Sequence, residues 1–290
     1  GPMTASFLDP NTMVQVDDEP NVRAGHRRIR DGMAVSAQNV WPSLEVDARA
    51  ANGLIGRFLA PGFYYKTFMK PAPLWPVYSK VLRQFASGGT VSKEISHDRY
   101  DARFAHPDVL IAGGGPAGMA AAFAAADEGA SVMLVDEEPQ LGGHLRYTTG
   151  CAEVRADLVC RVEAHPGIEV LTDSVVTGRY EHNWVAVMQR SHPGTTERLI
   201  KARAKSLVVA AGKVERPYVF EGNDLPGVML STGVQRLINL YAVRPGRRAV
   251  LLTPNETGDA VTEDLQRAGI ELAAVVHARE GHDIVRATGS

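Results

Sequence analysis

Residues 106–143 have the sequence HPDVLIAGGGPAGMAAAFAAADEGASVMLVDEEPQLGG, and the spacing of apolar residues within it sets the fold class. Val109–Ala112 is a short apolar run, Pro116–Glu128 is rich in alanine, and Val132–Val135 is a second apolar run. Runs that are apolar on both faces are typical of strands in a parallel sheet that is covered on both sides. The order predicts a strand, a helix and a strand of a Rossmann-like α/β domain.

The turn between the first strand and the helix is GGGPAG, which fits the pattern G-x-G-x-x-G. Gly113 permits a tight turn, and Gly115, which lacks a Cβ, permits close approach of a pyrophosphate. Gly118 lets the helix lie close to the strand. The start of the helix, at Pro116 and Ala117, offers partial positive charge to a diphosphate. All five residues are therefore predicted to bind a dinucleotide.

Three acidic residues follow the second strand. Asp136 comes directly after this strand, at about the spacing of 20 residues expected for the acid that binds the adenosine ribose. Glu137 and Glu138 come next, so a 2′-phosphate would meet three carboxylates. We therefore predict Asp136 and Glu137 as ligands and disfavour NADP, which leaves FAD and NAD.

Two later segments are expected to return to the cofactor, because glycine lets the backbone approach a ligand closely. One is the glycine pair after the acids, and the other ends a strand predicted at 206–210. In flavoproteins with two dinucleotide sites, that strand usually ends in Ala-Thr-Gly. Here alanine replaces the threonine, so a side-chain contact is not expected. The residues concerned are Gly142, Gly143, His144, Ala211 and Gly212. No acid–base constellation stands out, so no catalytic residue is assigned.

The rest of the sequence predicts three regions. Residues 1–100 form an arm without a βαβ pattern, and its aromatic residues between Phe58 and Phe85 predict burial against the next domain or against another subunit. Residues 101–245 form the dinucleotide-binding domain, with further strands at 168–171 and 184–188. Residues 246–290 begin a second βαβ unit whose turn, TPNETG, lacks the glycine fingerprint. Such an incomplete unit needs a partner or a longer natural chain to cover its sheet.

Composition narrows the possible partners and compartments. A formal net charge of −2 over 290 residues does not favour nucleic acid or an anionic membrane. No apolar run reaches the roughly 18 residues that a membrane-spanning helix needs. Cys151 and Cys160 form neither a CxxC pair nor a zinc set, so we expect no metal and a reduced, cytoplasmic protein.

Four stretches resemble the α subunit of heteromeric (tetrameric) sarcosine oxidase and related amine or imino-acid dehydrogenase subunits. They are EPNVRAGHRRIRDGMAVSAQNVWPSLEVD, APGFYYKTFMKP, YDARFAHPDVLIAGGGPAGMAAA and ERPYVFEGNDLPGVMLSTGVQRLINLYAV. The resemblance extends from about Pro10 to Arg279. The family's N-terminal ferredoxin-like domain and C-terminal folate-binding region have no counterpart in this sequence, so folate chemistry is not assigned.

This resemblance implies a heteromer that oxidises a secondary amine such as sarcosine. A β-type subunit holds FAD and the substrate, the α subunit holds NAD, or FAD in some relatives, and FMN lies between the subunits. The resemblance also implies that Gly113, Gly115, Gly118 and Asp136 are dinucleotide ligands, with Gly142, Gly143 and Gly212 as neighbours. Two alternatives stay open, which are a non-catalytic subunit with a structural dinucleotide and a stand-alone pyridine-nucleotide flavoprotein reductase.

Overall fold

The computed structural model describes residues 13–24, 27, 29–40, 42–47, 72–79, 89, 91–92, 94–95, 98–190, 192–254 and 257–278. The chain forms two compact units, residues 1–97 and residues 98–290. Most of the aromatic segment of the predicted arm lies outside the described residues, so its burial stays a prediction. The predicted division into three regions likewise stays a prediction.

The described part of the first unit contains a small antiparallel sheet. Its strands are β1 (Met13–Val16), β2 (Glu19–Arg23) and β3 (Val35–Ala37), in the order β2-β1-β3. A short 3-10 helix, η3 (Ala72–Leu74), follows later in the chain. No βαβ unit is present among these described elements.

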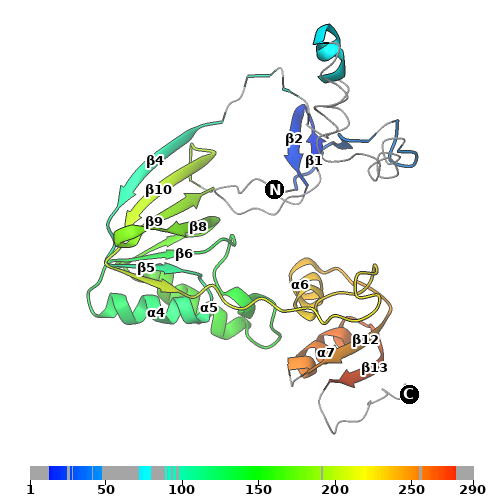
Figure 1. The fold of residues 1–290 in the computed structure, drawn as a ribbon. Coiled ribbons are helices and arrows are strands. Elements are labelled where there is room, and N and C mark those ends of the chain that lie inside the picture. Colours follow the sequence, from blue (N-terminus) through cyan, green and yellow to red (C-terminus); the bar gives the residue numbers. More distant parts are fainter. Residues whose placement is uncertain are drawn as a thin grey trace. The chain divides into compact units, whose positions relative to one another are not determined.

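The centre of the second unit is a parallel sheet in the order β11-β5-β6-β7 (Figure 1). Its strands are β5 (Val109–Ala112), β6 (Val132–Val135), β7 (Ile168–Leu171) and β11 (Ser206–Val209). Every residue of β6 is buried, because this inner strand is covered on both faces. The Rossmann-like α/β fold predicted from the apolar runs is therefore confirmed.

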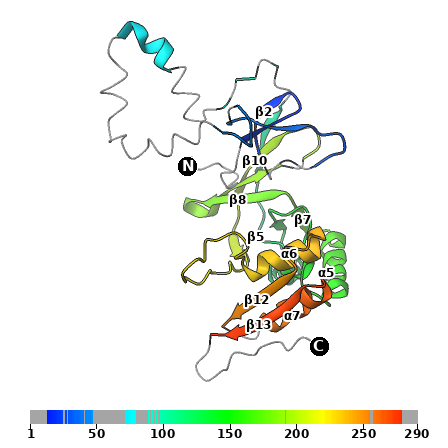
Figure 2. The same ribbon diagram turned by 90° about the vertical axis from the view of Figure 1, so that its right-hand side faces the viewer.

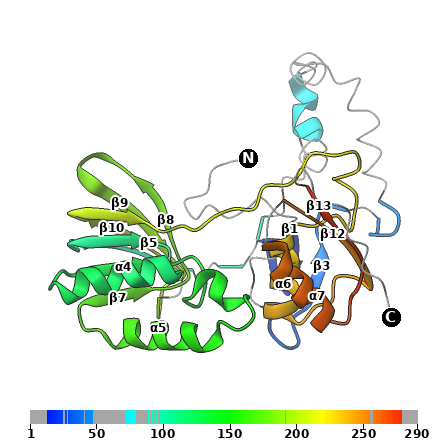
Figure 3. The ribbon, with the colours of Figure 1, turned by 90° about the horizontal axis from the view of Figure 1, so that it is seen from below.

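One face of the parallel sheet is covered by two helices, α4 (Pro116–Asp127) and α5 (Ala152–Ala164) (Figure 3). Met119 and Ala122 of α4 pack with Leu134 of β6, and Val162 of α5 joins the same core. Alanine dominates α4, so the helix axis can lie close to the strands. Each fully buried large apolar side chain stabilises this layer by about 1.5–3 kcal/mol.

The other face is covered by a mixed sheet in the order β4-β10-β9-β8. Its strands are β4 (Tyr100–Ala105), β8 (Ser174–Arg179), β9 (Trp184–Gln189) and β10 (Glu197–Arg203), and η5 (Glu181–Asn183) joins β8 to β9. Val187 and Ile200 pack against Leu110 and Met133 of the parallel sheet. The sequence predicted β9 but missed the other three strands. Each face of the parallel sheet thus has its own buried core.

The second βαβ unit consists of β12 (Arg248–Thr253), α7 (Thr257–Arg267) and β13 (Glu271–His277), preceded by α6 (Ser231–Tyr241) (Figure 2). In the described residues its parallel sheet contains β12 and β13. Leu251 and Leu265 belong to its core, against which α6 packs. Val250 and Leu252 point away from that core and are exposed. One face of this sheet is therefore uncovered among the described residues.

Candidate functional site

The glycine-rich segments meet at the carboxyl edge of the parallel sheet. The Gly113 N–H donates to the Val135 carbonyl at 2.8 Å, which joins the turn after β5 to the end of β6. The Gly142 N–H donates to the Gly114 carbonyl at 2.9 Å, which brings in the loop after β6. The Ala210 N–H donates to the Ala112 carbonyl at 2.8 Å. Ligands of open parallel α/β sheets bind at this edge.

Gly113 and Gly118 are required by the packing of the chain itself. Gly113 has a φ of +112°, and an added Cβ would overlap the Ala210 carbonyl. A Cβ at Gly118 would overlap the Gly113 carbonyl oxygen. The tight turn and the close approach of α4 therefore explain both glycines without a ligand.

Gly115 differs, because the fold does not require a glycine there. Its φ is −73°, and an added Cβ would meet only the Cα of Gly143, at an ordinary 3.8 Å. Gly115 is the N-cap of α4, and no side chain of the described residues caps the helix. Pro116 follows, and its missing N–H costs nothing at this position. The first turn thus presents free N–H groups and partial positive charge, as a phosphate site needs.

The glycine pair after the acidic residues brings its loop against the start of α4. Gly143 has a φ of +52°, and an added Cβ would lie 2.9 Å from the Cα of Gly115. His144 is exposed in η4 (Gly143–Arg146). Ala211 and Gly212 are also exposed, and Gly212 has a φ of +78° with open space beside it. The structure therefore brings the glycines to one edge and leaves His144 accessible there.

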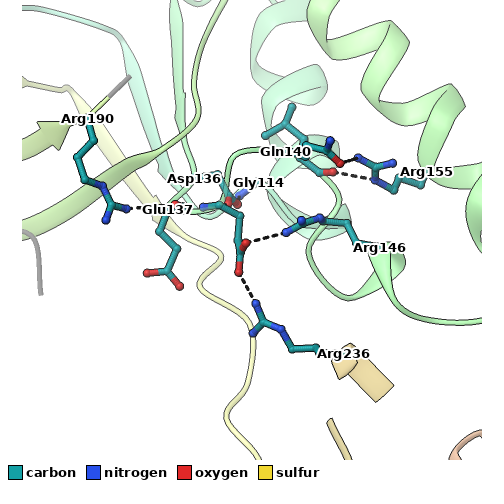
Figure 4. Close-up of polar contacts among 10 residues, drawn as sticks. Gly114, Asp136, Glu137, Gln140, Arg146, Arg155, Arg190 and Arg236 are labelled. Atoms are coloured by element: carbon teal, nitrogen blue, oxygen red, sulfur yellow. Dashed lines mark hydrogen bonds and ion pairs between the residues drawn. The ribbon is translucent and has the colours of Figure 1, made fainter. Parts of the chain in front are cut away.

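Asp136 ties the fingerprint turn to the loop after β6 (Figure 4). Its Oδ2 accepts a hydrogen bond from the Gly114 N–H, and its Oδ1 accepts one from the Glu138 N–H at 2.8 Å. Burial raises the pKa of this carboxyl above its ordinary value, and the two N–H groups oppose that rise. Each oxygen still has a second lone pair, so a ribose hydroxyl can bond to it.

Glu138 forms ion pairs with two arginines that the sequence analysis missed, Arg146 and Arg236, both of which are labelled in Figure 4. Its Oε2 is 2.8 Å from Nη1 of Arg146, and its Oε1 forms an ion pair with Arg236 of α6. Burial raises the pKa of Glu138, but the two arginines outweigh it, so the pKa lies below its ordinary value. The charge argument against a 2′-phosphate therefore rests on Asp136 and Glu137 rather than on all three acids.

Two more arginines hold the backbone of the same loop. Nε of Arg155 donates to the Leu141 carbonyl at 2.9 Å, and Nη2 of Arg190 donates to the Glu137 carbonyl at 3.3 Å. Arg155 lies in α5, 14 residues after Leu141, and Arg190 lies 53 residues after Glu137, so neither arginine belongs to a short motif with its partner. The loop after β6, which carries the predicted ribose ligand Asp136, is thus held by side chains from several other segments.

Glu138→Gln is expected to lower the free energy of unfolding by about 1 kcal/mol at pH 7, a value discounted for partial solvent exposure. A carboxyl whose folded pKa is lowered contributes stability above its unfolded pKa, near 4.5, and loses it as the pH falls through the folded pKa. The difference between variant and wild type should therefore shrink below pH 4.5. Urea denaturation at pH 7 and at pH 3.5 measures this, with Glu128→Gln at the exposed end of α4 as control. A difference that is constant with pH would contradict the pairing.

The chain shares extensive similarity with known proteins. A family model described as FAD dependent oxidoreductase matches residues 108–214. Sarcosine oxidase subunit alpha of Rhizobium meliloti (strain 1021) is 39% identical over 96% of this chain and 30% of the relative. The subunit of the same name from Corynebacterium sp. (strain P-1) is 38% identical over 62% of this chain and 20% of the relative. The chain thus spans less than a third of the length of these relatives.

A solved structure supports the fold independently. L-proline dehydrogenase from P. horikoshii aligns with a TM-score of 0.56 and 19% identity, over 96% of this chain and 48% of that chain. At this identity the likeness shows the fold alone. Among the described residues, no helix is long and apolar enough to cross a membrane. In sequence, the chain is thus similar to one segment of the sarcosine oxidase α subunit, and its residues 108–214 match the model of the FAD dependent oxidoreductase family.

Proposed function

We propose that this chain is the dinucleotide-binding subunit of a heteromeric flavin-dependent oxidoreductase that oxidises a secondary amine such as sarcosine. The observation that carries the proposal is the uncapped start of α4, where a ligand explains the glycine at 115 and packing does not. The relatives named sarcosine oxidase support the class of reaction. The proposed ligands are Gly113, Gly115, Pro116, Ala117, Gly118, Asp136, Glu137, Gly142, Gly143, His144, Ala211 and Gly212.

The proposed cofactor is FAD, because the family model that matches residues 108–214 is FAD dependent, and NAD is the alternative. The start of α4 would hold the diphosphate, and Asp136 would accept hydrogen bonds from the ribose. NADP is disfavoured by the carboxylates of Asp136 and Glu137. The flavin of the partner subunit, which holds the amine, would supply the acceptor for a hydride from the carbon beside the amine nitrogen. The protein supplies position and charge.

The proposed partner is a flavin-bearing β-type subunit that holds the amine, with FMN at the interface between the subunits. The relatives are named as subunits, which supports a heteromer. We assign no catalytic residue to this chain. A non-catalytic role, with a structural dinucleotide, is supported by the second βαβ unit, whose turn lacks the glycine fingerprint.

A stand-alone disulfide reductase would need two cysteines close in space. Cys151 and Cys160 are free thiols, at the N-cap of α5 and within α5. Nine positions along a helix correspond to about 13 Å. Disulfide formation needs Cα atoms within about 7 Å, so these two cysteines cannot form a redox pair.

The purified chain is expected to release FAD, or NAD, on denaturation, which mass spectrometry of the supernatant identifies. Asp136→Ala should raise the dissociation constant of that cofactor at least about 30-fold, because a charge-assisted hydrogen bond of about 2 kcal/mol is lost. Asp157→Ala, at an exposed position of α5, is the matched control. Release of no dinucleotide would overturn the proposal, and unchanged affinity in Asp136→Ala would reject the ribose role.

A further inference from the structure

Residues 213–230, called the apolar loop below, present an unusual number of apolar side chains to solvent. They connect β11 to α6 and form the yellow segment of Figure 3. Val214 and Val219 are 90% and 94% exposed. The other exposed apolar side chains of the loop are Tyr218, Phe220, Leu225, Val228, Met229 and Leu230.

The apolar loop is closed at its base by Glu215. This carboxylate accepts hydrogen bonds from the N–H and Oγ of Ser231, at 3.1 and 2.7 Å. It also accepts from the N–H and Oγ1 of Thr232, at 2.8 and 2.7 Å. The contacts cap α6 and join the two ends of the loop, as in a compact Ω-loop.

Turns inside the apolar loop fix its course. The Asn223 N–H donates to the Phe220 carbonyl at 3.2 Å, and the Leu225 N–H donates to the Gly222 carbonyl at 3.1 Å. The Asn223 side-chain amide donates to the Tyr218 carbonyl at 2.9 Å. These hydrogen bonds define the backbone between Tyr218 and Leu225, where the apolar side chains of Val219 and Phe220 are exposed.

The extent of this surface matches what a stable interface needs. Added residue by residue, the exposed area of these eight residues, backbone included, is on the order of 800 Å², which is about one partner's share of a standard protein–protein interface. Soluble monomers rarely expose apolar patches above a few hundred Å². Tyr, Phe and Met are also enriched in interface cores.

The loop begins at the cofactor edge of the sheet. It follows Gly212, and the carbonyl of Ala210 lies against Gly113 of the fingerprint turn. We propose that the apolar loop is the docking surface for the flavin-bearing partner subunit, an inference that rests on the proposed function. A partner subunit bound to this loop would contact the segment that directly follows the dinucleotide site in the chain.

The test is to produce the full chain together with the flavin-bearing oxidase subunit of its own organism and to measure their dissociation constant. The double variant Val214→Lys/Val219→Lys is expected to raise it at least about 100-fold, because two desolvated contacts each become buried charges. Val154→Lys, on the exposed side of α5 at 56% exposure, is the matched control and should stay within about twofold. Cofactor content and thermal unfolding of each chain alone should be unchanged, since the substituted positions are exposed.

The outcomes separate the two proposals. If wild type binds the partner and the loop variant binds equally well, the docking surface lies elsewhere and this inference is overturned. If wild type binds no partner, the heteromeric function itself fails, and the inference falls with it. If the loop variant unfolds earlier, or changes the self-association measured by light scattering, the loop is covered by this chain or by a second copy, which also overturns the inference.

Discussion

Gly118→Ala is expected to prevent residues 98–290 from folding stably, with a loss of at least about 3 kcal/mol from a typical total of 5–15 kcal/mol. The added Cβ would overlap the Gly113 carbonyl oxygen, which belongs to the turn between β5 and α4. Neither the turn nor the helix can move aside, because Met119 and Ala122 are fully buried against the sheet. Urea denaturation followed by circular dichroism measures the loss, together with the yield of soluble protein.

Gly115→Ala is the matched control, because its added Cβ has space within the fold. We expect a stability change below about 1 kcal/mol, within the cost of alanine at an N-cap. Cofactor affinity should nevertheless fall at least about 100-fold, because the methyl group occupies the space of the diphosphate. Equal stability of the two variants would refute the packing role of Gly118. Full retention of the cofactor by Gly115→Ala would refute the diphosphate site.

Asp264→Ala is expected to lower the free energy of unfolding of residues 98–290 by about 3 kcal/mol. The substitution leaves the buried donors that bond to Asp264 without an acceptor. The Asp264 side chain is 1% exposed and accepts hydrogen bonds from Thr149 Oγ1 at 2.6 Å and Gln235 Nε2 at 2.7 Å. It also pairs with Arg267 at 2.7 Å. The network joins α7 to α6 and to the loop after η4.

Differential scanning calorimetry and hydrogen exchange of α7 measure this effect. Asp259→Ala, an exposed position on the same helix, is the control and should change stability by less than about 0.5 kcal/mol. Faster exchange should extend to the backbone after η4, since Thr149 loses its acceptor. If Asp264→Ala behaves like the control, the network does not hold the elements together.

The sequence alone determined the elements around the glycine-rich turn. The predicted strands at 109–112, 132–135 and 168–171 coincide with β5, β6 and β7, and α4 ends one residue before the predicted end. Continuous apolar runs and a glycine-rich turn are local signals, because a parallel strand is buried on both faces and a tight turn requires residues without a Cβ. The candidate ligands at 113–118 and at 136 follow from the same local pattern.

Tertiary structure decided what surrounds that turn. The ion pair between Glu138 and Arg236 joins residues 98 positions apart, and the bond between Thr149 and Asp264 joins residues 115 positions apart. The covering sheet depends equally on distant pairing, since β10 pairs with β4, almost 100 residues earlier. Such contacts form because burial selects partners in space, and the sequence near each residue carries no sign of them. The sequence therefore determined the predicted cofactor turn, and only the fold showed which charges hold the loop beside it.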